Sequence, residues 1–141
     1  MQDLPALSSF HNNLDYIERT VAQLQKDFSY YGFDLEFDLE SGQGTAYEIL
    51  YNQVHPIIEE LVDYNYTRLL PVLYRIDISE EQIKATQTMN TDQRVSETIT
   101  TLILARELQK VVIREHFKQV SALESDSEVK GDNSQQISQG W

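Results

Sequence analysis

The chain has 141 residues, of which 40% are hydrophobic and 24% are charged, values typical of one globular domain rather than of a disordered chain. It contains no cysteine, which excludes disulfide bonds, thiol catalysis and zinc sites with cysteine ligands. The net charge of −12 disfavours direct binding to nucleic acid or to an anionic membrane surface, because like charges repel.

The N-terminal segment has the apolar pattern of an amphipathic helix. Large apolar residues recur at alternating spacings of three and four, which an α-helix places on one side. They are Leu7, Phe10, Leu14, Ile17, Val21, Leu24 and Phe28. We predict a helix from Pro5 to about Phe28, with Asp3 as its capping residue. Because this stripe must be buried against other helices, it predicts a helical bundle.

Apolar and acidic residues alternate along the segment 33–40, a pattern typical of a β-strand. The segment 72–78 also alternates, so one alternative is a small two-stranded ribbon formed by both segments. In the other alternative, 72–76 is helical and 33–40 is an extended arm lying on the bundle. We favour the second alternative, because isolated two-stranded ribbons are only marginally stable.

A second helix is predicted to begin after Thr45, because Thr45 and Glu48 have the spacing of a capping box. Its apolar positions continue the spacing of three and four as far as Leu73, which indicates a central helix. Pro56 is expected to kink or split this helix, and Pro71 to disturb its last turns.

Two further helices and a tail are predicted in the C-terminal half. Ser79 and Gln82 form another capping box, which opens a short helix ending near Met89. A residue within 90–92 is expected to cap a fourth helix, which runs to Gln119 or Val120. The polar composition of 124–141 predicts a disordered acidic tail after a helical domain that spans 1–123.

The fourth predicted helix is apolar on two nearly opposite sides, so it must be covered on both. Either the helix lies at the centre of the bundle, or its second side meets another chain. The candidate interface residues on that second side are Leu104, Leu108, Val111 and Val112.

Basic residues recur at every fourth position of the same helix, at Arg106, Lys110, Arg114 and Lys118. They are expected to pair with the acidic N-terminal half or to bind an acidic partner. Arg106 projects onto an apolar side, which predicts a buried or half-buried ion pair, or an anion contact. The candidate residues for that contact are Arg106, Arg75 and Asp77, and a residue of 34–40 is the alternative source of the carboxylate.

The sequence offers no convincing catalytic, cofactor or metal residues. No glutamate on these helices is followed by a histidine three residues later, as a di-metal bundle requires. His55 and Glu59 are spaced to share a metal, but two ligands make a weak site. The acidic residues of 34–40 lack the glycine and the final glutamate of a calcium loop, and no glycine-rich phosphate motif occurs.

The segments 73–80 and 106–111 resemble parts of small uncharacterised bacterial helical proteins. The resemblance covers the middle and C-terminal parts of the chain. It implies a bacterial cytoplasmic source, and it carries over no function and no site residue. A cytoplasmic location also agrees with the N-terminal residues, which lack the basic start and apolar run of a signal peptide.

We therefore predict an all-α, up-and-down bundle of three long helices and one short helix. The leading hypothesis is a non-enzymatic interaction or scaffold protein that binds itself, as a homodimer, or another protein. The alternative is a ligand-binding protein or enzyme with a tyrosine-lined pocket between the second and fourth helices, where Arg106 or His116 orients an anionic ligand. A third hypothesis is an acidic mimic of nucleic acid. No cofactor, direct nucleic-acid contact or membrane contact is expected.

Overall fold

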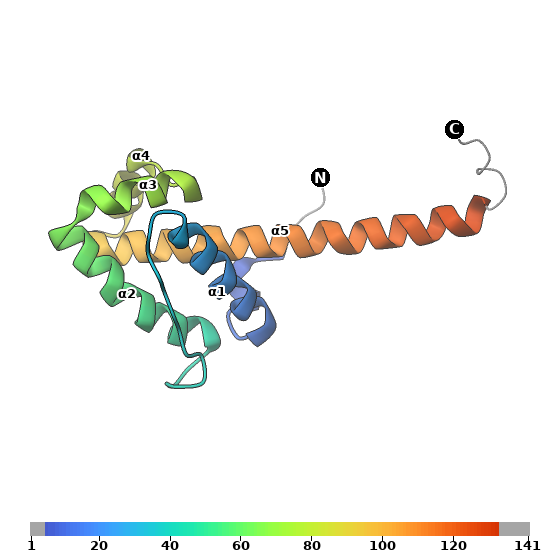
Figure 1. Ribbon diagram of the computed structural model, residues 1–141, viewed down its shortest axis with the longest axis horizontal. Helices are drawn as coiled ribbons and strands as arrows, with labels where there is room; N and C mark the ends of the chain where they lie inside the picture. The colour runs from blue at the N-terminus through green and yellow to red at the C-terminus, as the bar shows by residue number, and fades with distance from the viewer. Residues whose placement is uncertain (1–4, 133–141) are drawn as a thin grey trace.

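The computed structural model describes the backbone of residues 5–132 and the side chains of residues 5–123. This part of the chain is all-α: five α-helices pack as a bundle, preceded by one turn of 3₁₀-helix, and it contains no strand (Figure 1). The elements are η1 (Leu7–Phe10), α1 (Leu14–Ser29), α2 (Ala46–Tyr64), α3 (Tyr66–Ile76), α4 (Glu80–Met89) and α5 (Val95–Asp132).

Helix α5 is the central element of the bundle. Helices α1 and α2 make the most extensive contacts with it, and α3, α4 and η1 also pack against it. Figure 1 shows α5 running through the bundle and continuing beyond the other helices. The largest side chains that are fully buried come from α1, α2, α3 and α5: Ile17, Leu24, Phe28, Leu50, Ile58, Leu69, Leu73, Ile76, Ile99, Ile103, Leu104 and Leu108.

The first long helix begins later than its apolar stripe predicts. The segment from Pro5 to Phe10 contains only the 3₁₀ turn, and α1 starts after Asn13, whose Oδ1 accepts a hydrogen bond from the Tyr16 N–H at 3.1 Å. Asn is a strong N-cap residue, because its side chain satisfies a free N–H of the first turn. Leu7 and Phe10 still pack against the core, so the stripe correctly marks the buried side.

The segment 33–40 is an extended arm, as in the alternative that we favoured. Its apolar side chains are half-buried against the core, and its acidic side chains are exposed. Side-chain amides of α1 and α2 replace a partner strand: Gln25 Nε2 donates to the Leu35 carbonyl at 3.0 Å, and Gln53 Nε2 donates to the Asp38 carbonyl at 2.7 Å. The alternation therefore predicted the two faces correctly, although no strand pairs with the arm.

The predicted second helix is divided, but not at a proline. Pro56 lies inside α2 and Pro71 inside α3, and neither ends its helix. The division falls at Asn65, whose backbone leaves the helical region at φ −154° and ψ 46°. Asn is a poor residue for a helix interior, because its side chain competes for backbone hydrogen bonds. Residues 72–76 belong to α3, so the alternative strand at 72–78 does not form.

Both predicted capping boxes mark the starts of helices. The Glu48 N–H donates to Thr45 Oγ1 at 3.1 Å, and Glu48 Oε1 accepts from the Thr45 N–H at 2.9 Å, which caps α2. The Gln82 N–H donates to Ser79 Oγ at 3.0 Å, which caps α4.

We expect Thr45→Ala to lower the free energy of unfolding by about 1 kcal/mol, because it leaves a helix N–H without its side-chain acceptor. Urea titration followed by circular dichroism measures this change. The matched control is Thr91→Ala, at an exposed threonine outside the helices, which should change the free energy by less than about 0.5 kcal/mol. Equal values for the two variants would contradict the prediction.

Helix α5 differs from its predicted bounds at both ends. It starts at Val95, and Glu97 Oε1 accepts from the Arg94 N–H at 2.8 Å, so the cap does not lie within 90–92. It continues to Asp132, so 124–132 is helical where we predicted disorder. No glycine or proline interrupts the sequence until Gly131, so the backbone can continue the helix. The rest of the predicted tail, 133–141, lies outside the described residues.

Candidate functional site

The four residues that we assigned to an interface are covered within the single chain. Leu104, Leu108, Val111 and Val112 are between 0% and 3% exposed. Helices α1 and α2 make the most extensive contacts with α5, so packing within the bundle accounts for the burial of its two apolar sides. The two-sided pattern therefore corresponds to a central helix, and these four side chains are not available to another chain.

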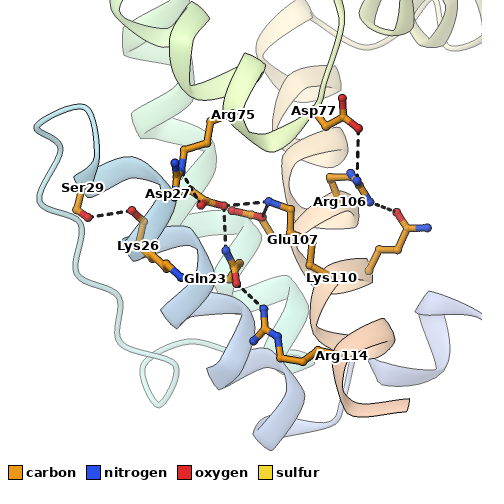
Figure 2. Close-up of polar contacts among 11 residues, drawn as sticks. Gln23, Lys26, Asp27, Ser29, Arg75, Asp77, Arg106, Glu107, Lys110 and Arg114 are labelled. Atoms are coloured by element: carbon orange, nitrogen blue, oxygen red, sulfur yellow. Dashed lines mark hydrogen bonds and ion pairs between the residues drawn. The ribbon is translucent and has the colours of Figure 1, made fainter. Parts of the chain in front are cut away.

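Arg106 and Asp77 lie together, but at the surface. Arg106 Nη2 is 3.4 Å from Asp77 Oδ2, and the two side chains are 32% and 81% exposed. Arg106 Nη1 also donates to Gln109 Oε1 at 2.9 Å (Figure 2). The expected pairing of Arg106 with Asp77 therefore forms, with Arg106 half-buried and Asp77 exposed, and an ion pair exposed to this degree contributes little to stability.

The buried ion pair involves Arg75 and a residue that the sequence analysis missed. Arg75 Nε lies 2.9 Å from Asp27 Oδ1, and the Asp27 side chain is 3% exposed. Lys110 Nζ lies 3.1 Å from Asp27 Oδ2, which also accepts from Gln23 Nε2 at 3.1 Å. The Arg75 guanidinium stacks 3.7 Å above the Tyr30 ring, on the outer side of the contact. Asp27 therefore links α1 to α3 and to α5 (Figure 2).

Glu107 faces Asp27 from α5 and is fully buried, and we call these two residues the acid pair. Lys110 Nζ lies 3.0 Å from Glu107 Oε1, but at an angle that does not form a hydrogen bond. Neither carboxyl oxygen of Glu107 has a hydrogen-bond partner among the described atoms. A buried carboxylate without partners is costly, so this environment favours the protonated form, whose O–H can donate to Asp27.

The two acids have opposite pKa shifts. Burial raises the pKa of Glu107 to about 8; the nearby Asp27 carboxyl adds to this rise, and Lys110 opposes it. Burial alone would also raise the pKa of Asp27, but its contacts with Glu107, Gln23, Lys110 and Arg75 together lower it to about 2. At neutral pH the acid pair therefore holds one proton, carried mainly by Glu107.

Two carboxyls with separated pKa values resemble the acid and base of a catalytic site. However, Asp27 and Glu107 are 2% and 0% exposed, so solvent and substrate do not reach them. The acid pair is therefore a structural link between helices. Two signals in the sequence point to it: Asp27 adjoins the stripe at Leu24 and Phe28, and Glu107 lies on a strip of its helix between Ile103 and Val111, which belong to the two apolar sides.

A second candidate site is the part of α5 that extends beyond the bundle (Figure 1). After the buried Val112, four apolar residues recur on one side at helical spacing: Ile113, Phe117, Val120 and Leu123. Phe117 is 55% exposed and Leu123 is 68% exposed, whereas Ile113 and Val120 are half-buried. We call these four residues the projecting stripe.

A third candidate site is a groove of about 720 Å³ between α3 and α4. Its apolar lining includes Tyr31, Leu70, Pro71, Tyr74 and Ile78, and its charged lining comprises Glu80, Glu81 and Lys84. We call it the α3–α4 groove. Tyr31 and Tyr74 line this groove. A second cavity of about 760 Å³ is lined by Tyr66 and Val95, which belong to the predicted second and fourth helices, together with residues of α4. Of the two residues expected to orient an anion in the predicted pocket, Arg106 pairs with Asp77, and the His116 ring contacts Phe117.

Neither a metal-binding cluster nor a membrane-spanning helix occurs in the described part of the chain. No group of three or more histidine, aspartate or glutamate side chains is placed there to hold a metal ion. None of the helices in this part of the chain has both the length and the hydropathy that a membrane crossing requires. Comparisons of the chain with protein-family models, with curated proteins and with solved structures found no match.

Proposed function

We propose that this protein is a non-enzymatic interaction module that self-associates through the projecting stripe of α5. The observation that carries the proposal is the exposure of Phe117 and Leu123 on a helix that continues beyond its own bundle. Burying a side chain of this type contributes about 1.5–3 kcal/mol, so covering the stripe supplies a real driving force for association. Contiguous exposed apolar patches on soluble proteins commonly mark binding sites.

The length of the projecting segment supports the same proposal. The part of α5 after Val112 continues to Asp132. A helical segment without tertiary packing is only marginally stable in water, because packing supplies most of the stability of protein helices. From Ile113 onward, no α5 side chain within the described range is fully buried. A partner that covers the stripe would therefore stabilise the helix as well as the interface.

A local charge contrast supports a second copy as the partner. Arg114 and Lys118 flank the projecting stripe on one side; Lys118 is 67% exposed and also lies 3.8 Å from Glu115. Two copies of net charge −12 repel as a whole, so the favourable contribution is limited to acidic side chains of the second copy that lie directly beside this basic flank. Electrostatic complementarity of this kind increases the rate of encounter and orients the partners.

We expect Phe117→Glu and Leu123→Glu each to weaken self-association by about tenfold or more, which corresponds to about 1.4 kcal/mol. Both side chains are exposed, so neither change should unfold the bundle. Light scattering over a range of concentrations measures the mass, and circular dichroism checks the fold.

The matched control for Leu123→Glu is Leu14→Glu, at a leucine of α1 that is 48% exposed and lies outside the projecting stripe. This control should self-associate like the wild-type protein. A wild-type protein that stays monomeric at all concentrations would overturn the proposal. Phe117→Glu and Leu123→Glu variants that associate as strongly as the Leu14→Glu control would also overturn it.

A further inference from the structure

We infer that the projecting stripe of one copy docks in the α3–α4 groove of the next copy, in a head-to-tail arrangement. This inference rests on the proposed self-association and adds the surface that receives the stripe. The groove is open, and its walls are apolar: Leu70, Pro71, Tyr74 and Ile78 line it. Tyr74 is 86% exposed within the single chain, so a large apolar contact surface is uncovered there.

The stripe and the groove match in kind, as one side of a helix and an apolar groove, and they carry opposite charges. The stripe is one side of a helix with apolar residues at helical spacing, and an amphipathic helix typically binds in an apolar groove. The charged lining of the groove is acidic on balance, because Glu80 and Glu81 outnumber Lys84. The stripe carries the opposite charge on its flank, at Arg114 and Lys118. Docking therefore brings basic residues to an acidic rim while both apolar surfaces leave water.

A single chain cannot make this contact with itself. Val95, the first residue of α5, lines a cavity together with Glu80 and Lys84 of α4, and these two residues also line the α3–α4 groove. Phe117 lies 22 residues after Val95 along a continuous helix, a separation of about 33 Å at 1.5 Å per residue. The groove and the stripe therefore lie at different ends of the molecule (Figure 1).

A contact between two different surfaces is heterologous. An assembly built from such contacts stays open-ended unless the rotation between successive copies completes a ring. In a linear assembly, the copy at one end keeps a free stripe, and the copy at the other end keeps a free groove. The arrangement thus predicts assemblies that grow beyond a dimer as the concentration rises. A symmetric pairing of two projecting stripes would instead stop at a dimer.

A mixing experiment with two variants tests the inference. Tyr74→Lys places a cation in the groove and leaves the stripe intact, whereas Phe117→Glu disrupts the stripe and leaves the groove intact. We expect each variant alone to associate at least about tenfold more weakly than the wild-type protein. An equimolar mixture should form a dimer and nothing larger, because it contains one intact groove and one intact stripe per pair. Light scattering measures the masses.

The matched control is Tyr64→Lys, at a tyrosine of α2 that is 83% exposed and does not line the groove. It should assemble like the wild-type protein. If Tyr74→Lys assembles like this control, the stripe binds elsewhere; the inference then fails while the proposed self-association stands. If both variants are monomeric and their mixture is also monomeric, the inference fails as well. A monomeric wild-type protein overturns both proposals.

Discussion

We expect Glu107→Gln to stabilise the protein at pH 8 by several kcal/mol and to leave its stability at pH 4 nearly unchanged. Gln has the size of a protonated glutamic acid, and its amide can donate to Asp27 as the O–H of a protonated Glu107 can. At pH 8 the wild-type protein must either hold a proton on Glu107 or bury a second negative charge beside Asp27. The amide avoids both costs.

The sign of this pH dependence follows from the direction of the pKa shift. The pKa of Glu107 is raised from 4.5 to about 8 on folding, so the folded state binds more protons than the unfolded state between these values. The Glu107 contribution to the free energy of unfolding therefore falls as the pH rises through this range, by up to about 1.4 kcal/mol per pH unit. Asp27 acts oppositely: its contribution is present above pH 3.8 and is lost as the pH falls through about 2.

Urea unfolding of both proteins between pH 4 and pH 9 tests this prediction, and the difference between them isolates the contribution of Glu107. The matched control is Glu60→Gln, at an exposed glutamate of α2. It should follow the wild-type profile within about 0.5 kcal/mol. A loss of stability in Glu107→Gln at every pH would show instead that Glu107 is ionised and pairs with Lys110.

The second large effect is expected at Asp27. Asp27→Asn should destabilise the protein by about 3 kcal/mol at neutral pH, because it removes the carboxylate that Arg75 and Lys110 share. The effect should lie at the lower end of the range for buried pairs, since both cations are partly exposed. The loss of the Asp27 charge should also lower the pKa of Glu107, because that charge helps to hold the proton.

Urea titration at neutral pH measures the destabilisation, and Asp15→Asn is the matched control. Asp15 also pairs with an arginine, Arg19, at 3.2 Å, but its side chain is 63% exposed. An exposed ion pair contributes at most about 1 kcal/mol, so Asp15→Asn should lower the free energy of unfolding far less than Asp27→Asn does. Similar losses for Asp27→Asn and Asp15→Asn would contradict the assignment of Asp27 as the link between α1, α3 and α5.

Features that depend on residues close in sequence were predicted correctly. The capping box at Thr45 and the side-chain cap at Ser79 mark the starts of α2 and α4, because a capping side chain bonds only two or three residues ahead. The alternation of 33–40 predicted which side chains face the core, because successive residues of an extended chain point to opposite sides.

The errors occurred where local signals compete. Proline commonly ends a helix, yet α2 continues through Pro56 and ends at Tyr64, with Asn65 as its cap. The N-terminal stripe continues the helical period back to Leu7, but the Asn13 cap starts α1 later. In both places several local conformations are compatible with the same residues, and packing against the rest of the bundle selects one of them.

The sequence by itself thus determined the helical class, the helix starts at capping boxes and the buried faces, since each is specified within a few residues along the chain. The tertiary structure alone decided which residues meet across the bundle. Asp27 and Lys110 are 83 positions apart, and no periodicity relates them. Likewise, the sequence shows apolar residues along all of α5, but only packing separates the covered Leu104 and Leu108 from the uncovered Phe117 and Leu123. Burial depends on what the rest of the chain covers, and that is a property of the whole fold.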